Sequence, residues 1–233
     1  MSSELSTVSI LGFGFVLGLW HAKDPDHLAA VSTIVADKKN LLSSTIVGGF
    51  WGIGHTLSLL AVGALVIFLK LQISESMESK LEAAVGVMLV LLGLNDLRKL
   101  RKKTKVHIHS HEHEGHLHTH VHMHADETKE VTHHFEKFSP RAILIGTVHG
   151  LAGSAGVMLL ILPTIGTPLV AIIYILIFGV GSILGMMLMS LLIGLPMYFT
   201  AGRFEAVNRA ILGIAGTFSL FLGGFIVYER LLS

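Results

Sequence analysis

Long apolar runs dominate the chain, and short polar segments separate them. A helix needs roughly 17–25 mostly apolar residues to cross the hydrocarbon core of a bilayer. Six runs are long enough to cross, and the first of them carries a polar cluster near its middle. The six expected spans are residues 8–35, 41–69, 81–97, 142–162, 169–195 and 210–228. The pattern therefore predicts an all-α polytopic membrane protein with about six transmembrane helices.

Composition agrees with a membrane protein and narrows the chemistry. Hydrophobic residues are 52% of the 233 residues and charged residues are 14%, whereas soluble domains carry about 25% charged residues. A net charge of +1 without a basic stripe gives no reason to expect nucleic-acid binding. The chain has no cysteine, which excludes disulfides, thiolate metal sites and a cysteine nucleophile. Its 15 histidines are therefore its most distinctive feature.

The placement of lysine and arginine predicts the orientation of the spans. The segments after the first, third and fifth spans lie on one side of the membrane and hold 13 of the 17 lysine and arginine residues. The opposite side holds three, and Lys23 lies within a span. Because positively charged loops are retained in the cytoplasm, we expect the long polar loop there and both termini outside.

The two halves of the chain match each other at a spacing of 127–128 residues. Each half contains three spans, which is an odd number, so the second copy is expected to be inverted in the membrane. Transporters frequently use inverted repeats with a binding site near the midplane. The matched segments are 19–22 with 147–150, 50–55 with 177–182, and 83–87 with 210–214. The predicted organisation is a first three-helix repeat (1–98), a loop (99–140) and a second three-helix repeat (141–233).

The polar cluster of the first span reads His21-Ala22-Lys23-Asp24-Pro25-Asp26-His27. Each Asp or Lys at the centre of a bilayer costs at least about 2.5–3.5 kcal/mol, so the cluster requires compensation. On a continuous helix, His21 and His27 would lie about 240° apart. Pro25 disfavours helical backbone at Asp24 and suits the first turn of a new helix. We therefore predict that the first helix is broken within this motif.

Such a break has two chemical interpretations. Backbone carbonyls freed at the end of the first half-helix, together with imidazole and carboxylate groups, suit a first-row divalent metal ion. Alternatively, Asp24 caps the second half-helix and Asp26 pairs with Lys23 inside the protein.

Two further histidines lie inside predicted spans. His55 follows Gly52 and Gly54, which permit close approach of a neighbouring helix. His149 aligns with His21 in the repeat. A hydrogen bond between helices is the alternative role for either histidine. No catalytic residue is predicted, and the candidate metal ligands are His21, Asp24, Asp26, His27, His55 and His149.

Histidine alternates with other residues through much of the loop after the third span. This alternation suits neither a lipid-facing helix nor a packed core, so it predicts a disordered, multidentate tract that captures metal ions. A solubilising linker is the alternative. The predicted auxiliary metal-capturing residues are His107, His109, His111, His113, His116, His118, His120, His122 and His124, and the tract also includes His133 and His134.

The first motif resembles the signature of the nickel/cobalt transporter family (NiCoT), most closely its short, urease-linked UreH-type branch. That signature is histidine, four residues, then aspartate and histidine, which His21, Asp26 and His27 reproduce, with Pro25 at a position where alanine is usual. The pair Gly54-His55 and the segment 149–154 are similar to later family motifs. The eight spans and later acidic motifs of full-length members are not matched here.

The resemblance implies a permease, not an enzyme, in the inner membrane of a prokaryotic cell. Ni²⁺ or Co²⁺ is then the transported substrate, with no catalytic cofactor, and uptake is the expected direction. Efflux of the same ions is one alternative. A membrane-embedded metalloenzyme is another, although the spans lack an evident catalytic acid–base pair. The implied partners are the metal ion, the lipid bilayer and cytoplasmic nickel chaperones or urease and hydrogenase maturation proteins.

Overall fold

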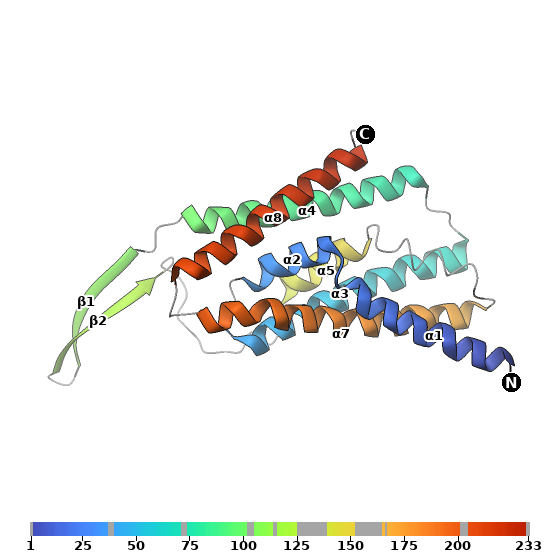
Figure 1. Cartoon of the computed structure of the whole chain (residues 1–233), viewed down its shortest axis with the longest axis horizontal. Helices are drawn as coiled ribbons and strands as arrows, with labels where there is room; N and C mark the ends of the chain where they lie inside the picture. Colours follow the sequence, from blue (N-terminus) through green and yellow to red (C-terminus); the bar gives the residue numbers. More distant parts are fainter. Residues whose placement is uncertain are drawn as a thin grey trace.

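The computed structural model describes residues 2–36, 40–70, 74–101, 105–113, 116–124, 139–151, 165, 167–200 and 205–231. Within these ranges the chain forms seven α-helices and one two-stranded hairpin (Figure 1). The elements are α1 (Ser2–His21), α2 (Pro25–Val35), α3 (Leu41–Leu69), α4 (Glu75–Arg101), β1 (Lys105–His113), β2 (His116–His124), α5 (Pro140–Leu151), α7 (Pro168–Thr200) and α8 (Glu205–Leu231).

Three helices in the described part of the chain are long and apolar enough to cross a membrane. They are Leu41–Leu69, Pro168–Thr200 and Ala206–Leu231, and they contain the second, fifth and sixth predicted spans. The predicted third span lies inside α4, whose two ends are charged. Only the beginning of the predicted fourth span, which falls on α5, is within the described residues.

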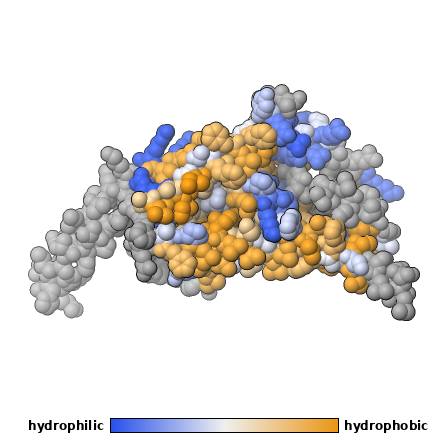
Figure 2. Space-filling view, in the orientation of Figure 1, coloured by the Kyte–Doolittle hydropathy of each residue, from blue (hydrophilic) through white to orange (hydrophobic). Residues whose placement is uncertain are grey.

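The outer surface agrees with a lipid environment. Figure 2 shows apolar side chains over most of the coloured part of the visible face. Large apolar side chains are strongly exposed on the longest helices, such as Leu169 (71%) on α7 and Phe221 (72%) on α8. Soluble monomers rarely expose contiguous apolar surface on this scale. The chain is a helical membrane protein.

Small residues allow the long helices to pack backbone against backbone. A Cβ atom added at Gly54 of α3 would overlap the carbonyl oxygen of Ile143 on α5. One added at Gly181 of α7 would overlap the carbonyl oxygen of Phe15 on α1. Helices of membrane proteins use such positions because dispersion contacts and weak polar contacts replace the hydrophobic effect between them. The result is a layer in which α1 packs on α7, α7 on α3, and α3 on α5.

Helices α4 and α8 form a second, antiparallel pair (Figure 1). Gly86 and Gly93 of α4 lie against Gly223 and Gly216 of α8, so residue numbers run in opposite directions along the contact. The hydroxyl of Ser219 donates to the carbonyl oxygen of Leu89 at 2.9 Å. An ion pair between Arg230 and Glu82 joins one end of the pair.

The short helix α2 lies between these two groups of helices and contacts α3, α4, α7 and α8. Its inward side consists of small residues, among them Ala29, Ala30 and Val31, which are completely or almost completely buried. Because these side chains are short, the neighbouring helices approach α2 from several directions. The first turn of α2 is therefore held against the bundle, with His27 fully buried and Asp26 partly buried.

The expectation of a disordered histidine tract is corrected for residues 105–113 and 116–124, which form an antiparallel hairpin. Its register pairs histidine with histidine, for example His107 with His122 and His113 with His116. The physical reason lies in the alternation itself, because a period of two is also the period of a β-strand. The β-branched residues Val106, Ile108 and Val121 favour that conformation. His133 and His134 lie outside the described residues.

Candidate metal centre

The connection between α1 and α2 determines how the first motif is arranged. Helix α1 ends at His21, and the following turn is closed by the Lys23 and Asp24 amides, which donate to the carbonyl oxygens of Trp20 and His21 at 3.0 Å each. Pro25 occupies the first turn of α2, where a missing N–H group costs nothing. The change of direction brings the rings of His21 and His27 to a centroid distance of 4.3 Å.

Asp24 immediately precedes α2, and its side chain contacts a histidine and does not cap that helix. Its backbone is extended (φ −58°, ψ 143°), and its side chain makes no capping hydrogen bond. The carboxylate oxygen Oδ2 instead lies 2.8 Å from Nδ1 of His21. Asp24 therefore orients the His21 ring through Nδ1 and makes no contact with Nε2, the other ring nitrogen.

Four helices each contribute one histidine to the same place. His21 ends α1, His27 lies in the first turn of α2, His55 lies in the middle of α3, and His149 lies near the end of α5. The ring of His27 is 4.1 Å from His149 and 5.3 Å from His55, measured between centroids. All four side chains are buried. We call these four histidines, together with Asp24 and Asp26, the histidine cluster.

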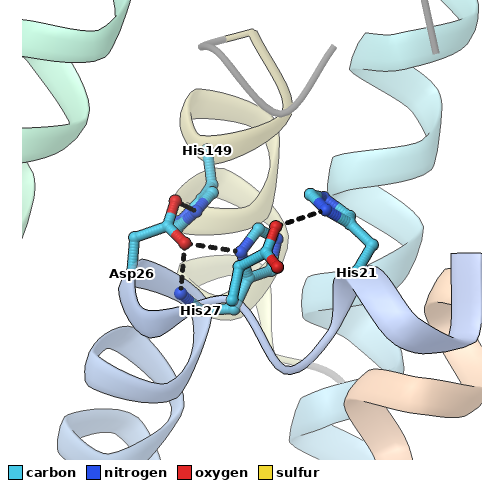
Figure 3. A network of polar contacts seen from close by, with 5 residues as sticks. His21, Asp26, His27 and His149 are labelled. Atoms are coloured by element: carbon cyan, nitrogen blue, oxygen red, sulfur yellow. Dashed lines mark hydrogen bonds and ion pairs between the residues drawn. The ribbon is translucent and has the colours of Figure 1, made fainter. Parts of the chain in front are cut away.

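Asp26 connects the two halves of the chain within this cluster (Figure 3). Its Oδ1 accepts the backbone N–H of His27 at 2.9 Å and lies 3.0 Å from Nδ1 of the same residue. Its Oδ2 lies 2.8 Å from Nε2 of His149. One carboxylate thus holds two imidazoles from helices that are distant in the sequence.

Several buried nitrogen atoms of the histidine cluster have no hydrogen-bond partner among the described residues. They are Nε2 of His21, Nε2 of His27, both ring nitrogens of His55, and Nδ1 of His149. Each buried polar atom without a partner costs about 1–3 kcal/mol, so native proteins seldom retain several together. This concentration of unsatisfied imidazole nitrogens is the property expected of a site that takes a ligand.

The spacing of the ligand atoms suits a metal ion. Two groups, His21 with His27 and His55, and Asp26 with His27 and His149, offer one ligand atom per residue within 4.8 Å of one another. Metal–nitrogen bonds of about 2.1 Å place opposite ligands about 4.2 Å apart. Small side-chain adjustments therefore suffice for either group to surround one ion.

Two aromatic residues that sequence reasoning missed line the histidine cluster. The buried ring of Trp51 lies 5.3 Å from His27 and 5.6 Å from His149, and Phe178 lies 5.6 Å from His21. Trp51 is one helical turn before His55, which places both on one face of α3. The repeat aligns Phe178 with Trp51, and this correspondence was the available signal.

All six candidate ligands of the spans lie together, whereas the nine candidate histidines of the loop do not join them. The hairpin of β1 and β2 is at one end of the molecule, beyond the end of α4 (Figure 1). The histidine cluster is formed by α1, α2, α3 and α5 in the interior of the bundle. The chain therefore presents two separate concentrations of histidine.

Comparison with known proteins agrees with this chemistry. The model of the NicO family, described as "High-affinity nickel-transport protein", matches residues 7–228. The urease accessory protein UreH of Bacillus sp. (strain TB-90) is 38% identical over 239 residues, which cover 97% of this chain and 93% of that protein. No solved structure matches the chain. The resemblance carried by His21, Asp26 and His27 is confirmed, and the chain belongs to the NicO family of nickel transporters, which are membrane permeases and not enzymes.

Proposed function

We propose that the chain carries Ni²⁺ into the cell through the histidine cluster. The observation that supports this site most strongly is the set of buried imidazole nitrogens without partners, which four helices bring together in the interior of the bundle. An ion bound there would satisfy several of these atoms at once. Its positive charge would be compensated by the carboxylates of Asp24 and Asp26.

The donor set also defines the class of substrate. Imidazole nitrogen suits Ni²⁺ and Co²⁺, and carboxylates add negative charge without the softness of a thiolate. We therefore propose Co²⁺ as a second substrate of the same site. Hard ions such as Mg²⁺ prefer an oxygen shell, which the four imidazoles do not provide.

We further propose that the membrane part consists of two inverted three-helix repeats, 1–98 and 141–233, with α1 and α2 as one interrupted span. Reciprocal contacts support this arrangement. Gly54 of α3 faces Ile143 and Thr147 of α5, and Gly181 of α7 faces Phe15 and Leu19 of α1. These two sets of positions correspond at the spacing found in the sequence. The histidine cluster would then lie at the interface of the repeats.

The proposed location is the prokaryotic inner membrane, with the segment 99–140 in the cytoplasm and both termini outside. The excess of lysine and arginine on one side supports this orientation. Helix α1 begins at the end of the molecule away from the hairpin, and α8 starts on the hairpin side and runs away from it (Figure 1), which also supports this orientation.

We propose that the histidines of β1 and β2 retain nickel on the cytoplasmic side. The histidine-to-histidine register supports this role, because it gathers many imidazole-bearing residues on a short ladder. The UreH relative is named a urease accessory protein. Cytoplasmic nickel chaperones, or urease and hydrogenase maturation proteins, are therefore the proposed recipients of the ion.

The direction of transport is tested by measuring radioactive nickel uptake and efflux in cells that express the chain. If the chain takes up nickel, its expression should raise the amount of cell-associated nickel. The His21→Ala variant, inserted normally, should not show this increase. Trp20→Ala is a matched control, because this neighbouring side chain is 64% exposed and outside the histidine cluster. Faster nickel loss from preloaded cells would show export instead.

A further inference from the structure

We infer that the histidine cluster contains two alternative positions for a single ion, and that His27 belongs to both of them. This inference rests on the proposed function, because it describes how the same cluster handles its substrate. It follows from the two groups of ligand atoms, which overlap at one residue only.

The ring of His27 lies between the two groups. His21 is on one side at a centroid distance of 4.3 Å, and His149 is on the other at 4.1 Å (Figure 3). Nδ1 of His27 lies 3.0 Å from Oδ1 of Asp26 and so belongs to the side that includes His149. Nε2 of His27 is buried without a partner among the described residues. It is therefore the nitrogen available to an ion bound with His21 and His55.

The first position consists of imidazoles alone. Nε2 of His21, Nε2 of His27 and one nitrogen of His55 would surround the ion. Carboxylates support two of these rings from behind, since Asp24 holds Nδ1 of His21 and Asp26 holds Nδ1 of His27. Outer carboxylates of this kind orient a histidine ligand and select the nitrogen that binds metal. All three ligands of this position come from the first half of the chain.

The second position includes a residue from the second half. Asp26, Nδ1 of His27 and His149 would surround the ion there. The ion would replace the existing contact between Oδ2 of Asp26 and Nε2 of His149, which are 2.8 Å apart. Asp26 therefore supports the ring of His27 when the ion is in the first position and binds the ion directly in the second.

The chemistry of a neutral imidazole makes the two positions exclusive. A neutral ring carries one proton, and only the other nitrogen has a lone pair available for metal. When the ion moves from the Nε2 side of His27 to the Nδ1 side, the ring proton must move from Nδ1 to Nε2 by exchange with water. The ring keeps one proton in both states. His27 would thus pass one ion from the first half of the chain to the second.

Nickel binding to the purified full-length chain tests this inference. The hairpin, with its proposed nickel-binding histidines, is present in every variant, so bound nickel is measured relative to His27→Ala, which removes the shared ligand. We expect wild type to bind one nickel ion per chain more than His27→Ala. His55→Ala and His149→Ala should each retain that one ion, because each variant leaves all the ligands of the other position in place, and both should transport nickel more slowly than wild type.

The identity of the bound ligands provides a second readout. X-ray absorption is measured on the chain in which the eleven histidines from His107 through His134 are replaced by asparagine. His149→Ala should show an all-imidazole site, and His55→Ala should show mixed imidazole and carboxylate ligands. Circular dichroism and insertion in lipid vesicles verify folding, and His55→Gln and His149→Gln replace any alanine variant that fails to fold.

Two results would overturn the inference and leave the proposed function intact. If wild type at saturation bound two nickel ions per chain more than His27→Ala, both positions would be occupied at the same time. Complete loss of the extra ion in both single variants, while wild type binds and transports, would show one joint site. Absence of both binding and transport in wild type would instead overturn the proposed function itself.

Discussion

His149 on α5 lies with its Nε2 atom 2.8 Å from Oδ2 of Asp26 on α2, although 123 residues separate the two in the sequence. Asp26 also contacts the ring of His27, so this carboxylate determines the relative orientation of two imidazoles. Both histidines are almost completely buried, whereas the side chain of Asp26 is 27% exposed. The Asp26 carboxylate is therefore partly exposed, and it also contacts two buried imidazoles of the histidine cluster.

Asp26→Asn removes the negative charge and keeps the size of the side chain. We expect nickel uptake to fall at least about tenfold, because charge-assisted contacts to both histidines are lost and each is worth about 1.5–3 kcal/mol. Uptake of radioactive nickel, normalised to the amount of inserted protein, measures this effect. Glu75→Gln is a matched control, because Glu75 is exposed at the start of α4. Equal uptake by Asp26→Asn and this control contradicts a role for the carboxylate.

Gly54→Ala tests the close packing that positions His55 next to α5. The added methyl group would overlap backbone atoms of Ile143 and Thr147, which cannot rotate away. Overpacking of this kind costs about 1–3 kcal/mol, so we expect a lower Tm in detergent and weaker nickel binding. Gly12→Ala and Gly224→Ala are matched controls, because an added Cβ meets nothing within 4 Å at either position. A Tm equal to that of the controls would argue against the contact.

Part of this arrangement is predictable from local chemistry, and part of it depends on tertiary packing. Proline and aspartate at positions 24–26 predict a change of direction, and the structure has α1 ending at His21 and α2 beginning at Pro25. The approach of His149 to Asp26 depends instead on how α5 packs against α3, which no local pattern specifies. The position of Trp51 was missed for the same reason. The sequence of a span does not show locally whether an aromatic residue faces lipid or the interior of the bundle.

The loop illustrates a different limit. Alternation of polar residues was interpreted as disorder because it excludes a packed core, but the same period of two also satisfies a hairpin ladder. Composition indicates whether a segment can be buried. It does not indicate whether the two halves of that segment pair as strands of a hairpin.

Deletion of residues 107–124 should leave nickel transport measurable. The hairpin lies beyond the end of α4 and apart from the histidine cluster (Figure 1), so its loss should change the apparent affinity or regulation while the route remains. Initial rates of radioactive nickel uptake over a range of concentrations separate these effects. Complete loss of transport by a normally inserted deletion variant would place the hairpin on the route of the ion.

Competition between metal ions tests the donor set. Unlabelled Co²⁺ should compete strongly with nickel uptake, Zn²⁺ weakly, and Mg²⁺ and Ca²⁺ not at all, because imidazole ligands favour transition metals over hard ions. The measurement is the concentration of each ion that halves the initial rate. Effective competition by Mg²⁺ would show that the carboxylates dominate the site and that the histidines have a structural role.

The most direct test of the account is nickel exchange across vesicles reconstituted with purified protein, because exchange of labelled for unlabelled nickel requires no energy source. Wild type should exchange nickel far faster than protein-free vesicles. The His27→Ala variant, inserted in equal amount, should exchange no faster than protein-free vesicles, because His27 contributes to both groups of ligand atoms. Exchange by His27→Ala at the wild-type rate would contradict the central claim that the ion crosses the membrane through the histidine cluster.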